Sequence, residues 1–314
     1  MARIDFVQLP EHKAMKLRGL LALHGRWCFS HRSKKWRQNT NHLLLEDIGS
    51  LVGKEKVKKH CKLFLEDFSE RKISNYYFDV LKKRKILTEM IKESNYDHVS
   101  SITGRASIKN GFNYLTQKKQ ERSNIEIKKG HSLVEVDIKS CEPSFLNTVL
   151  YGTNIKDIYS EFGKDSNCDR IKKKIAIIST LYGGSKKKIA NNSGMNISDV
   201  QKIFEYFQVE NITKKIIQEH DNKGYFTNFY GRKIYEISSP LNYWLQSSSA
   251  DYCHLAFLHL VKSTGCNLKA VIHDAVLLEV PNDILDNFKK IKYVYDPMSK
   301  IKLHVDIIVI SQYI

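Results

Sequence analysis

Two aspartates stand out because each lies among residues that favour burial. Asp137 comes near the end of the alternating segment HSLVEVDI (131–138), and Asp274 interrupts the apolar run VIHDAVLLEV (271–280). A lone carboxylate in such surroundings carries a heavy desolvation cost. If the two segments are neighbouring strands, the acids meet at the end of one sheet, where Mg²⁺, which prefers oxygen ligands, would stabilise them. Two metal ions held there would activate a hydroxyl and stabilise a leaving phosphate, whereas the alternative for either acid alone is a turn cap.

A second set of residues recurs at intervals of four. Arg170, Lys174, Ile178 and Tyr182 occupy such positions in RIKKKIAIISTLYGG, and four residues are slightly more than one helical turn. These side chains therefore line one face of a predicted helix, with two cations at one end and an apolar and an aromatic residue at the other. Arginine binds phosphate bidentately and lysine acts as a point charge, so this face suits a nucleotide. The alternative is a solvated lysine face, which is common on basic helices.

The overall charge favours an anionic partner. The 314 residues include 51 Lys and Arg against 34 Asp and Glu, which gives a formal net charge of +17. A nucleic-acid backbone is the commonest partner for such an excess, and a lysine-rich surface of biased composition is the alternative. Between His12 and Leu45 lie eight cations and no acid, with Trp27, Phe29 and Trp36 among them. That mixture suits contact with phosphates and bases, and aromatic residues packed in a core are the alternative.

Composition argues against several other classes of protein. Hydrophobic residues make up 42% of the chain, which predicts a folded protein. The six cysteines form no CxxC pair and do not lie at zinc-ligand spacing from histidine, so we interpret them as reduced intracellular thiols. No segment approaches the roughly 18 apolar residues of a membrane span, and the N-terminus lacks the apolar segment of a signal peptide. A cytoplasmic protein without a membrane partner is expected.

The elements that must position these residues are a mixture of strands and helices. Strands are predicted over 131–138 and 301–310, and the run 271–280 is predicted to form a hairpin with His273 and Asp274 at its bend. Helices are predicted over 169–190, interrupted at Tyr182–Gly184, over 198–220 with a cap at Ser198, and over 241–262. Residues 1–95 are predicted to be basic and helical. Helices inserted between strands, with a hairpin near the end, indicate an α+β chain.

These motifs resemble the polymerase region of a family-A (Pol I-like) DNA polymerase. VEVDIKSCEPSFL resembles motif A of that family, RIKKKIAIISTLYGGS resembles motif B, and VIHDAVLLEVP resembles motif C. Three further segments resemble family motifs in the same order: TGRAS (103–107), GYFTNFYGRKIYE (224–236) and NYWLQSSSAD (242–251). The six matches cover residues 103–281 and leave the first hundred residues without a counterpart.

The resemblance implies a right-hand polymerase fold with an antiparallel palm sheet, helical fingers and a small helical, thumb-like N-terminal region. It places that region at 1–95, the first part of the palm at 96–165, the fingers at 166–232 and the second part of the palm at 233–314. It also implies a template-directed DNA polymerase that adds deoxynucleotides to a primer 3′ end. The implied partners are primer–template nucleic acid and nucleoside triphosphates, and no proofreading exonuclease is expected because nothing upstream resembles one.

The resemblance also assigns roles to individual residues. Asp137 and Asp274 would be the catalytic, metal-binding carboxylates of a site for two Mg²⁺ ions, with Mn²⁺ as a substitute and the backbone carbonyl of Ile138 as a further ligand. The residues implied in nucleotide binding are Arg170, Lys174, Ile178, Tyr182 and Glu142. The residues implied in primer or template binding are Arg105, Gly183, Gly184, Asn242, Gln246 and His273.

Three departures from the family pattern bear on the expected activity. Ile178 replaces an aromatic residue, Ala275 replaces the acid that usually follows His–Asp, and Ser238 stands where arginine is usual. The aliphatic Ile178 fits a single-subunit RNA polymerase or a primase-like enzyme better, whereas Glu142 argues against admission of a 2′-hydroxyl. A third hypothesis is a non-catalytic nucleic-acid-binding protein of polymerase descent. Such a protein would have lost a metal-binding carboxylate or the phosphate-binding pair, whereas this sequence retains Asp137, Asp274, Arg170 and Lys174.

Overall fold

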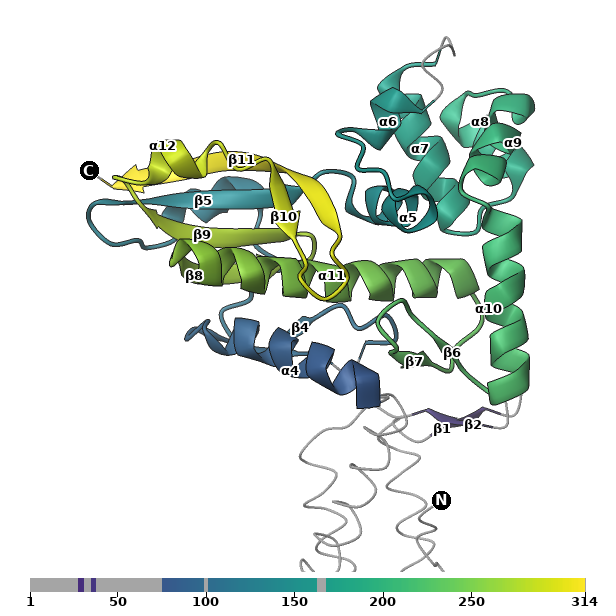
Figure 1. The fold of residues 1–314 in the computed structure, drawn as a ribbon, viewed down its shortest axis with the longest axis horizontal. Coiled ribbons are helices and arrows are strands. Elements are labelled where there is room, and N and C mark those ends of the chain that lie inside the picture. The colour runs from purple at the N-terminus through teal and green to yellow at the C-terminus, as the bar shows by residue number, and fades with distance from the viewer. Residues whose placement is uncertain (1–27, 31–34, 38–74, 99–100, 163–167, 314) are drawn as a thin grey trace, which may run out of the picture. The chain divides into compact units, whose positions relative to one another are not determined.

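The computed structural model describes residues 28–30, 35–37, 75–98, 101–162 and 168–313 (Figure 1). The chain divides into two compact units, Met1–Ile73 and Ser74–Ile314. In the first unit the described residues form an antiparallel hairpin of β1 (Cys28–Ser30) and β2 (Lys35–Arg37). Most of the region predicted to be helical, 1–95, lies outside the described residues. Its described part holds these two strands, helix α4 (Asn75–Glu89) and strand β3 (Ser94–Asp97), so this part is not helical throughout.

A five-stranded antiparallel sheet is the centre of the second unit. Its strands lie in the order β10-β11-β5-β9-β8. Their bounds are β5 (His131–Ile138), β8 (Asn267–Ile272), β9 (Ala275–Pro281), β10 (Tyr293–Tyr295) and β11 (Lys302–Tyr313). Residues 275–280 of β9 are all buried, which explains why this strand is a nearly continuous apolar run and does not alternate. The predicted strands, including the hairpin within 271–280, are confirmed.

Helix α11 (Pro240–Thr264) lies between this sheet and α4 (Figure 1). Residues 247–258 of the helix are buried on every side, as expected of a helix enclosed between two layers. Tyr252 donates a hydrogen bond to the carbonyl of Val294 on β10 at 3.0 Å, and Tyr77 of α4 donates one to Asp251 at 2.8 Å. The helix thus connects the sheet to α4, and its prediction over 241–262 is confirmed.

Between β5 and α11 the chain is mostly helical. The elements are α5 (Cys141–Tyr151), α6 (Ile158–Glu161), α7 (Arg170–Leu181), α8 (Lys186–Ser193), α9 (Ile197–Tyr206), α10 (Val209–Lys223) and the hairpin of β6 (Phe226–Thr227) and β7 (Lys233–Ile234). The single helix predicted over 198–220 is wrong, because Gln208, with a φ of 47°, separates α9 from α10. A left-handed residue cannot continue a right-handed helix, and burial of Phe207 beside it outweighs the local helical pattern. The cap is Asn196, whose side chain accepts from the N–H of Asp199 at 2.7 Å, not Ser198.

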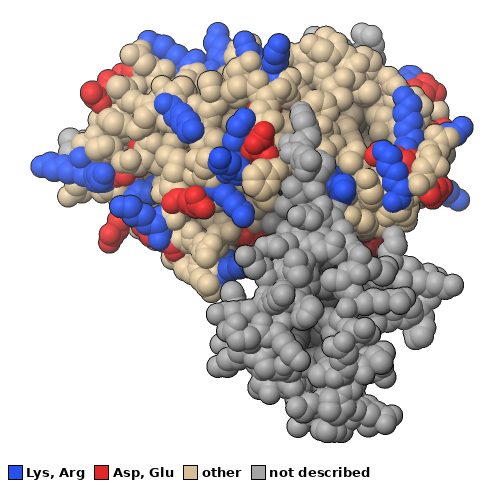
Figure 2. All heavy atoms as spheres, turned by 60° about the horizontal axis from the view of Figure 1, so that its bottom comes forward, with Lys and Arg blue, Asp and Glu red and all other residues tan. Residues whose placement is uncertain are grey.

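The remaining described elements are β4 (Ser107–Gly111), which pairs with β3, the 3-10 helix η2 (Lys119–Asn124) and α12 (Leu285–Phe288). Helices combined with an antiparallel sheet confirm the expected α+β class. Among the described residues no helix has the length and apolar character needed to span a membrane. Basic side chains are spread over the face drawn in Figure 2, with acidic side chains among them.

Candidate active site

Asp137 and Asp274 meet at one end of the sheet. Asp137 is the penultimate residue of β5, and Asp274 belongs to the two-residue turn between β8 and β9. The backbone N–H of Ile138 donates to the carbonyl of Asp274 at 3.0 Å, so the two segments are in direct contact. Burial, and after it the charge of Asp274, raises the pKa of Asp137 to about 6, as neighbouring carboxylates do. The structure therefore brings together the two acids singled out in the sequence.

The turn that carries Asp274 contains a conformationally strained residue. His273 has a φ of 54°, which two-residue hairpin turns require and which glycine adopts more readily. Strained backbone of this kind is concentrated at functional sites. Burial and the nearby charge of Arg105 lower the pKa of His273, so its ring is neutral at pH 7. A neutral imidazole can both donate and accept a hydrogen bond at this position.

The two carboxylates fit a hard divalent cation, although the chain offers few further ligands. In the described part of the chain, no side chain donates a hydrogen bond to the carboxylate of Asp137 or Asp274 or forms an ion pair with it. Ala275 is in register with Asp137 and adds no oxygen, and the carboxylate of Asp306, also in register with it, pairs with Lys139 at 2.6 Å. Over the described ranges, no group of three or more His, Cys, Asp and Glu side chains is arranged to hold a metal. A cation here would depend on the two acids, backbone oxygen, water and substrate phosphates.

Helix α7 exposes the row of side chains predicted from its spacing. The residues that it buries are Lys173, Ala176, Ile177, Thr180 and Leu181. Arg170, Lys174 and Tyr182 are exposed, and Ile178 is partly exposed. Two neighbours in the same helix, Ile171 and Ile175, are also exposed, by 69% and 39%. Apolar and aromatic surface beside cations suits stacking on a base next to a phosphate.

Arg105, Glu142 and Tyr182 form a polar cluster that links three segments. Nη2 of Arg105 lies 2.6 Å from Oε1 of Glu142, the second residue of α5. The hydroxyl of Tyr182, at the end of α7, lies close to both side chains and shifts the pKa of each toward its charged form. Burial raises the pKa of Glu142, and Arg105 opposes that rise. Gly183 follows Tyr182 with a φ of 83° and leads through Gly184 into α8, so the cluster lies at the turn between two helices.

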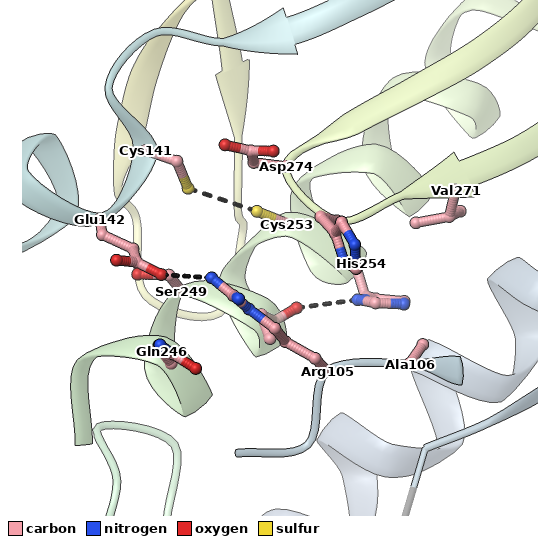
Figure 3. A pocket seen from close by; sticks show the side chains of 12 residues that line it. Arg105, Ala106, Cys141, Glu142, Gln246, Ser249, Cys253, His254, Val271 and Asp274 are labelled. Carbon is pink, nitrogen blue, oxygen red and sulfur yellow. Dashed lines mark hydrogen bonds and ion pairs between the residues drawn. The ribbon is translucent and has the colours of Figure 1, made fainter. Parts of the chain in front are cut away.

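A pocket opens beside Asp274, and Figure 3 shows the side chains around it. The expected site residues that line it are Arg105, Glu142, Gln246, His273 and Asp274. Asn242 lies one turn before Gln246 on α11, and its Oδ1 is buried with no hydrogen-bond partner in the part of the chain that the structure describes. A buried acceptor without a partner is costly unless a ligand supplies a donor. Arg170, Lys174 and Ile178 lie along α7 outside this pocket.

One buried network around Asp251 connects the three further segments that resemble family motifs. Arg84 of α4 binds the Asp251 carboxylate and donates to the carbonyl of Gly104 at 2.5 Å. Asn228 donates to Asp251 at 2.7 Å, and Arg232 donates to the carbonyl of Ser101 at 2.8 Å. Residues from 103–107, 224–236 and 242–251 are therefore fixed to one another. Because Arg105 follows Gly104 directly, the network also fixes the backbone from which Arg105 reaches Glu142.

Two residues in contact with Arg170 were missed in the sequence. Asp157 forms an ion pair with Arg170, and the Tyr159 ring lies under its guanidinium. An aspartate before a short helix is a recognisable cap, but a separation of thirteen positions between Asp157 and Arg170 fits no helical or strand spacing. No pattern in the sequence could have paired them.

Comparisons with known proteins bear on the fold and the sequence of the chain. No known family model matches the sequence. A DNA polymerase of Mycobacterium phage L5 is 32% identical over an alignment of 118 residues, which covers 34% of this chain and 20% of the phage protein. The polymerase (POL) domain of Pol1 from M. smegmatis, solved in complex with DNA primer-template and dNTP, matches 96% of this chain with a TM-score of 0.50 and 14% sequence identity.

The chain has a fold similar to that of the Pol1 polymerase domain. It spans about a fifth of the phage relative and 65% of the Pol1 chain. The expected α+β polymerase fold is confirmed. The division of the chain at residues 95, 165 and 232 stays a prediction, as do the roles of its individual residues.

Proposed function

We propose that the chain is a template-directed DNA polymerase that adds deoxynucleotides to a primer 3′ end. The observation that carries the proposal is the meeting of Asp137 and Asp274 at the end of the sheet of a polymerase-like core. The names of the similar proteins support the substrate class, since one is a DNA polymerase and the other was solved with DNA primer-template and dNTP. The net charge of +17 suits the same polyanionic partner.

Asp137, Asp274 and the backbone carbonyl of Ile138 would hold the catalytic cations, Mg²⁺ or Mn²⁺ in its place. When bound, two such ions would activate the primer hydroxyl and stabilise the leaving pyrophosphate. A carboxylate must be ionised to bind metal. The pKa of about 6 for Asp137 leaves it mostly ionised at pH 7 to 8 even without a cation, so the site is ready to bind one in that range.

Arg170 and Lys174 would bind the triphosphate of the incoming nucleotide. Their charges would be most effective on the negative charge that develops during transfer, because fixed cations stabilise a transition state without rearranging. Tyr182 and Ile178 would lie beside the new base pair. Glu142, held by Arg105 and Tyr182, would crowd the 2′ position of the sugar and favour deoxynucleotides.

The remaining site residues would contact the nucleic acid. Arg105, Asn242, Gln246 and His273 would donate hydrogen bonds to primer or template, and the unpartnered Oδ1 of Asn242 would accept one. The small residues Gly183 and Gly184 would let the template strand pass close to the end of α7.

Primer extension tests the proposal. Purified protein is given a primed DNA template, Mg²⁺ and either deoxynucleotides or ribonucleotides. We expect templated incorporation of deoxynucleotides, loss of it in Asp137→Ala and Asp274→Ala with DNA binding retained, and a higher nucleotide requirement in Lys174→Ala. Equal or preferred use of ribonucleotides would support the RNA polymerase or primase-like alternative, which the aliphatic Ile178 favours. DNA binding without any incorporation would support the non-catalytic alternative.

A second assay concerns fidelity. We propose that this chain by itself does not remove mismatched 3′ ends. A primer with a mismatched, labelled 3′ nucleotide should therefore remain intact in the absence of nucleotides, and its shortening by pure protein would contradict this part of the proposal.

A further inference from the structure

Arg170 is already held by an acid on a neighbouring element. Its Nε donates to Oδ2 of Asp157 at 2.6 Å, and its Nη2 donates to Oδ1 of the same carboxylate at 3.3 Å. This pairing uses one edge of the planar guanidinium. Nη1 makes no hydrogen bond to any described residue, and the side chain is 52% exposed. The edge formed by Nη1 and Nη2 is therefore available to an oxyanion while Asp157 holds the other edge.

Asp157 is itself fixed in place. It caps α6, where its Oδ1 accepts from the N–H of Tyr159 at 3.1 Å and its Oδ2 accepts from the hydroxyl of Ser160 at 2.8 Å. Each carboxylate oxygen thus has one partner in α6 and one in Arg170. A carboxylate restrained in this way fixes the orientation of the Arg170 guanidinium better than a mobile surface acid would. Neither the carboxylate nor the guanidinium then has to become ordered when a ligand binds.

The Tyr159 ring packs against the Arg170 guanidinium and connects it to the segment that follows Asp137. The Arg170 guanidinium carbon lies 5.3 Å from the centre of the Tyr159 ring, and the tyrosine is 4% exposed. The Tyr159 hydroxyl lies close to the side chain of Ser140, which has a φ of 49° and lies three residues after Asp137. The stacked pair therefore joins the first residue of α7 to the strained turn that follows Asp137 and begins α5.

We propose that Asp157 and Tyr159 are positioning residues, which hold Arg170 so that its free edge meets a phosphate of the nucleotide beside Asp137. This inference rests on the proposed nucleotide-binding role of Arg170. Asp157 also reduces the positive charge near that phosphate, so it could instead compete with the nucleotide for Arg170. Removal of the Asp157 charge would weaken nucleotide binding if Asp157 positions Arg170, and would strengthen it if Asp157 competes. The two roles can be separated by the sign of the change in nucleotide affinity.

Nucleotide affinity is measured on a DNA primer-template whose primer ends in a dideoxynucleotide, with the next complementary dNTP as the probe. Asp157→Asn keeps an oxygen that can cap α6 but loses the ion pair, and we expect it to raise the Kd for dNTP about tenfold, as loss of a charge-assisted bidentate pair implies. Tyr159→Leu should raise the Kd about threefold through the lost stacking, and Tyr159→Phe, which keeps the ring, should change it less.

The matched control is Asp169→Asn. Asp169 precedes Arg170 directly and caps α7 through the N–H of Lys172 at 2.8 Å, so this change removes an equal charge next to Arg170 without touching its guanidinium. We expect a dNTP Kd within twofold of wild type. In a double-mutant cycle, Asp157→Asn is added to Arg170→Gln. It should not change the dNTP Kd further, because the guanidinium that Asp157 positions is absent.

Three results would overturn the inference. A Kd that is unchanged or lower in Asp157→Asn would show competition or no role, and an equal effect of Asp157→Asn in the Arg170→Gln background would show a structural role only. An Asp169→Asn effect as large as that of Asp157→Asn would show that net charge matters and orientation does not. If Arg170→Gln binds dNTP as wild type does, or wild type binds none, it is the proposed function that fails.

Discussion

Replacement of Asp251 by asparagine should destabilise the protein severely. Asp251 and Arg84 are both fully buried, with side-chain exposures of 0%, and the Asp251 carboxylate also accepts hydrogen bonds from Tyr77 and Asn228. Arg232, 2% exposed, is a second buried guanidinium in the same network. Removing one partner of a buried ion pair leaves an uncompensated charge, which costs about 3–5 kcal/mol. The asparagine amide would add a donor where three donors already converge, so we expect the upper half of that range.

Urea unfolding measures this effect directly. A loss of about 4 kcal/mol is a large part of the roughly 5–15 kcal/mol of a typical domain, and it should lower the urea midpoint by more than about 1 M. The control is Asp286→Asn, since this side chain is 91% exposed and its ion pair with Lys289 lies at the surface. The control should change the free energy of unfolding by less than about 0.5 kcal/mol. A change of less than about 1 kcal/mol in Asp251→Asn would refute the assignment of Asp251 as the counter-charge of the network.

Three further predictions follow from the site and its surroundings. Asp137 has a pKa of about 6 in the folded state against 3.8 ordinarily, so its contribution to stability is present below pH 4 and is lost as the pH rises through 6. Asp137→Asn should therefore unfold at higher urea than wild type at pH 8 in metal-free buffer and at equal urea at pH 4; no gain at pH 8 would contradict the raised pKa. Gly104→Ala should cost about 1–3 kcal/mol in urea unfolding, because φ is 67° and the added Cβ would lie 2.5 Å from Nη1 of Arg232; wild-type stability would contradict this packing. The affinity for DNA, measured by fluorescence anisotropy, should fall steeply and linearly in log–log form with salt; salt-insensitive binding would separate the net charge from nucleic acid.

The fold could be predicted wherever strand spacing and turn chemistry pointed to the same arrangement. The apolar run at 271–280, broken by His273 and Asp274, could only bury its side chains as a hairpin with the polar pair at the bend. The strand ending at Asp137 could then reach that bend as a neighbour in the sheet. The row from Arg170 to Tyr182 could be placed on one face because its spacing of four residues fits a helix.

Other features had no local signal. The break at Gln208 lacks glycine or proline and is imposed by tertiary packing around Phe207. Arg84 and Asp251 are 167 positions apart, and only the packing of α4 on α11 brings them together. The contact between Asp157 and Arg170 likewise depends on how α6 packs on α7, so it could not be found from residue spacing.

The most direct test of the central claim is single-nucleotide incorporation on four primed DNA templates that differ only in the templating base. With Mg²⁺ present, the wild-type protein should add the complementary deoxynucleotide on each template, and Asp274→Asn should add none while binding the same DNA. Incorporation that ignores the templating base, or full activity in Asp274→Asn, would contradict the account.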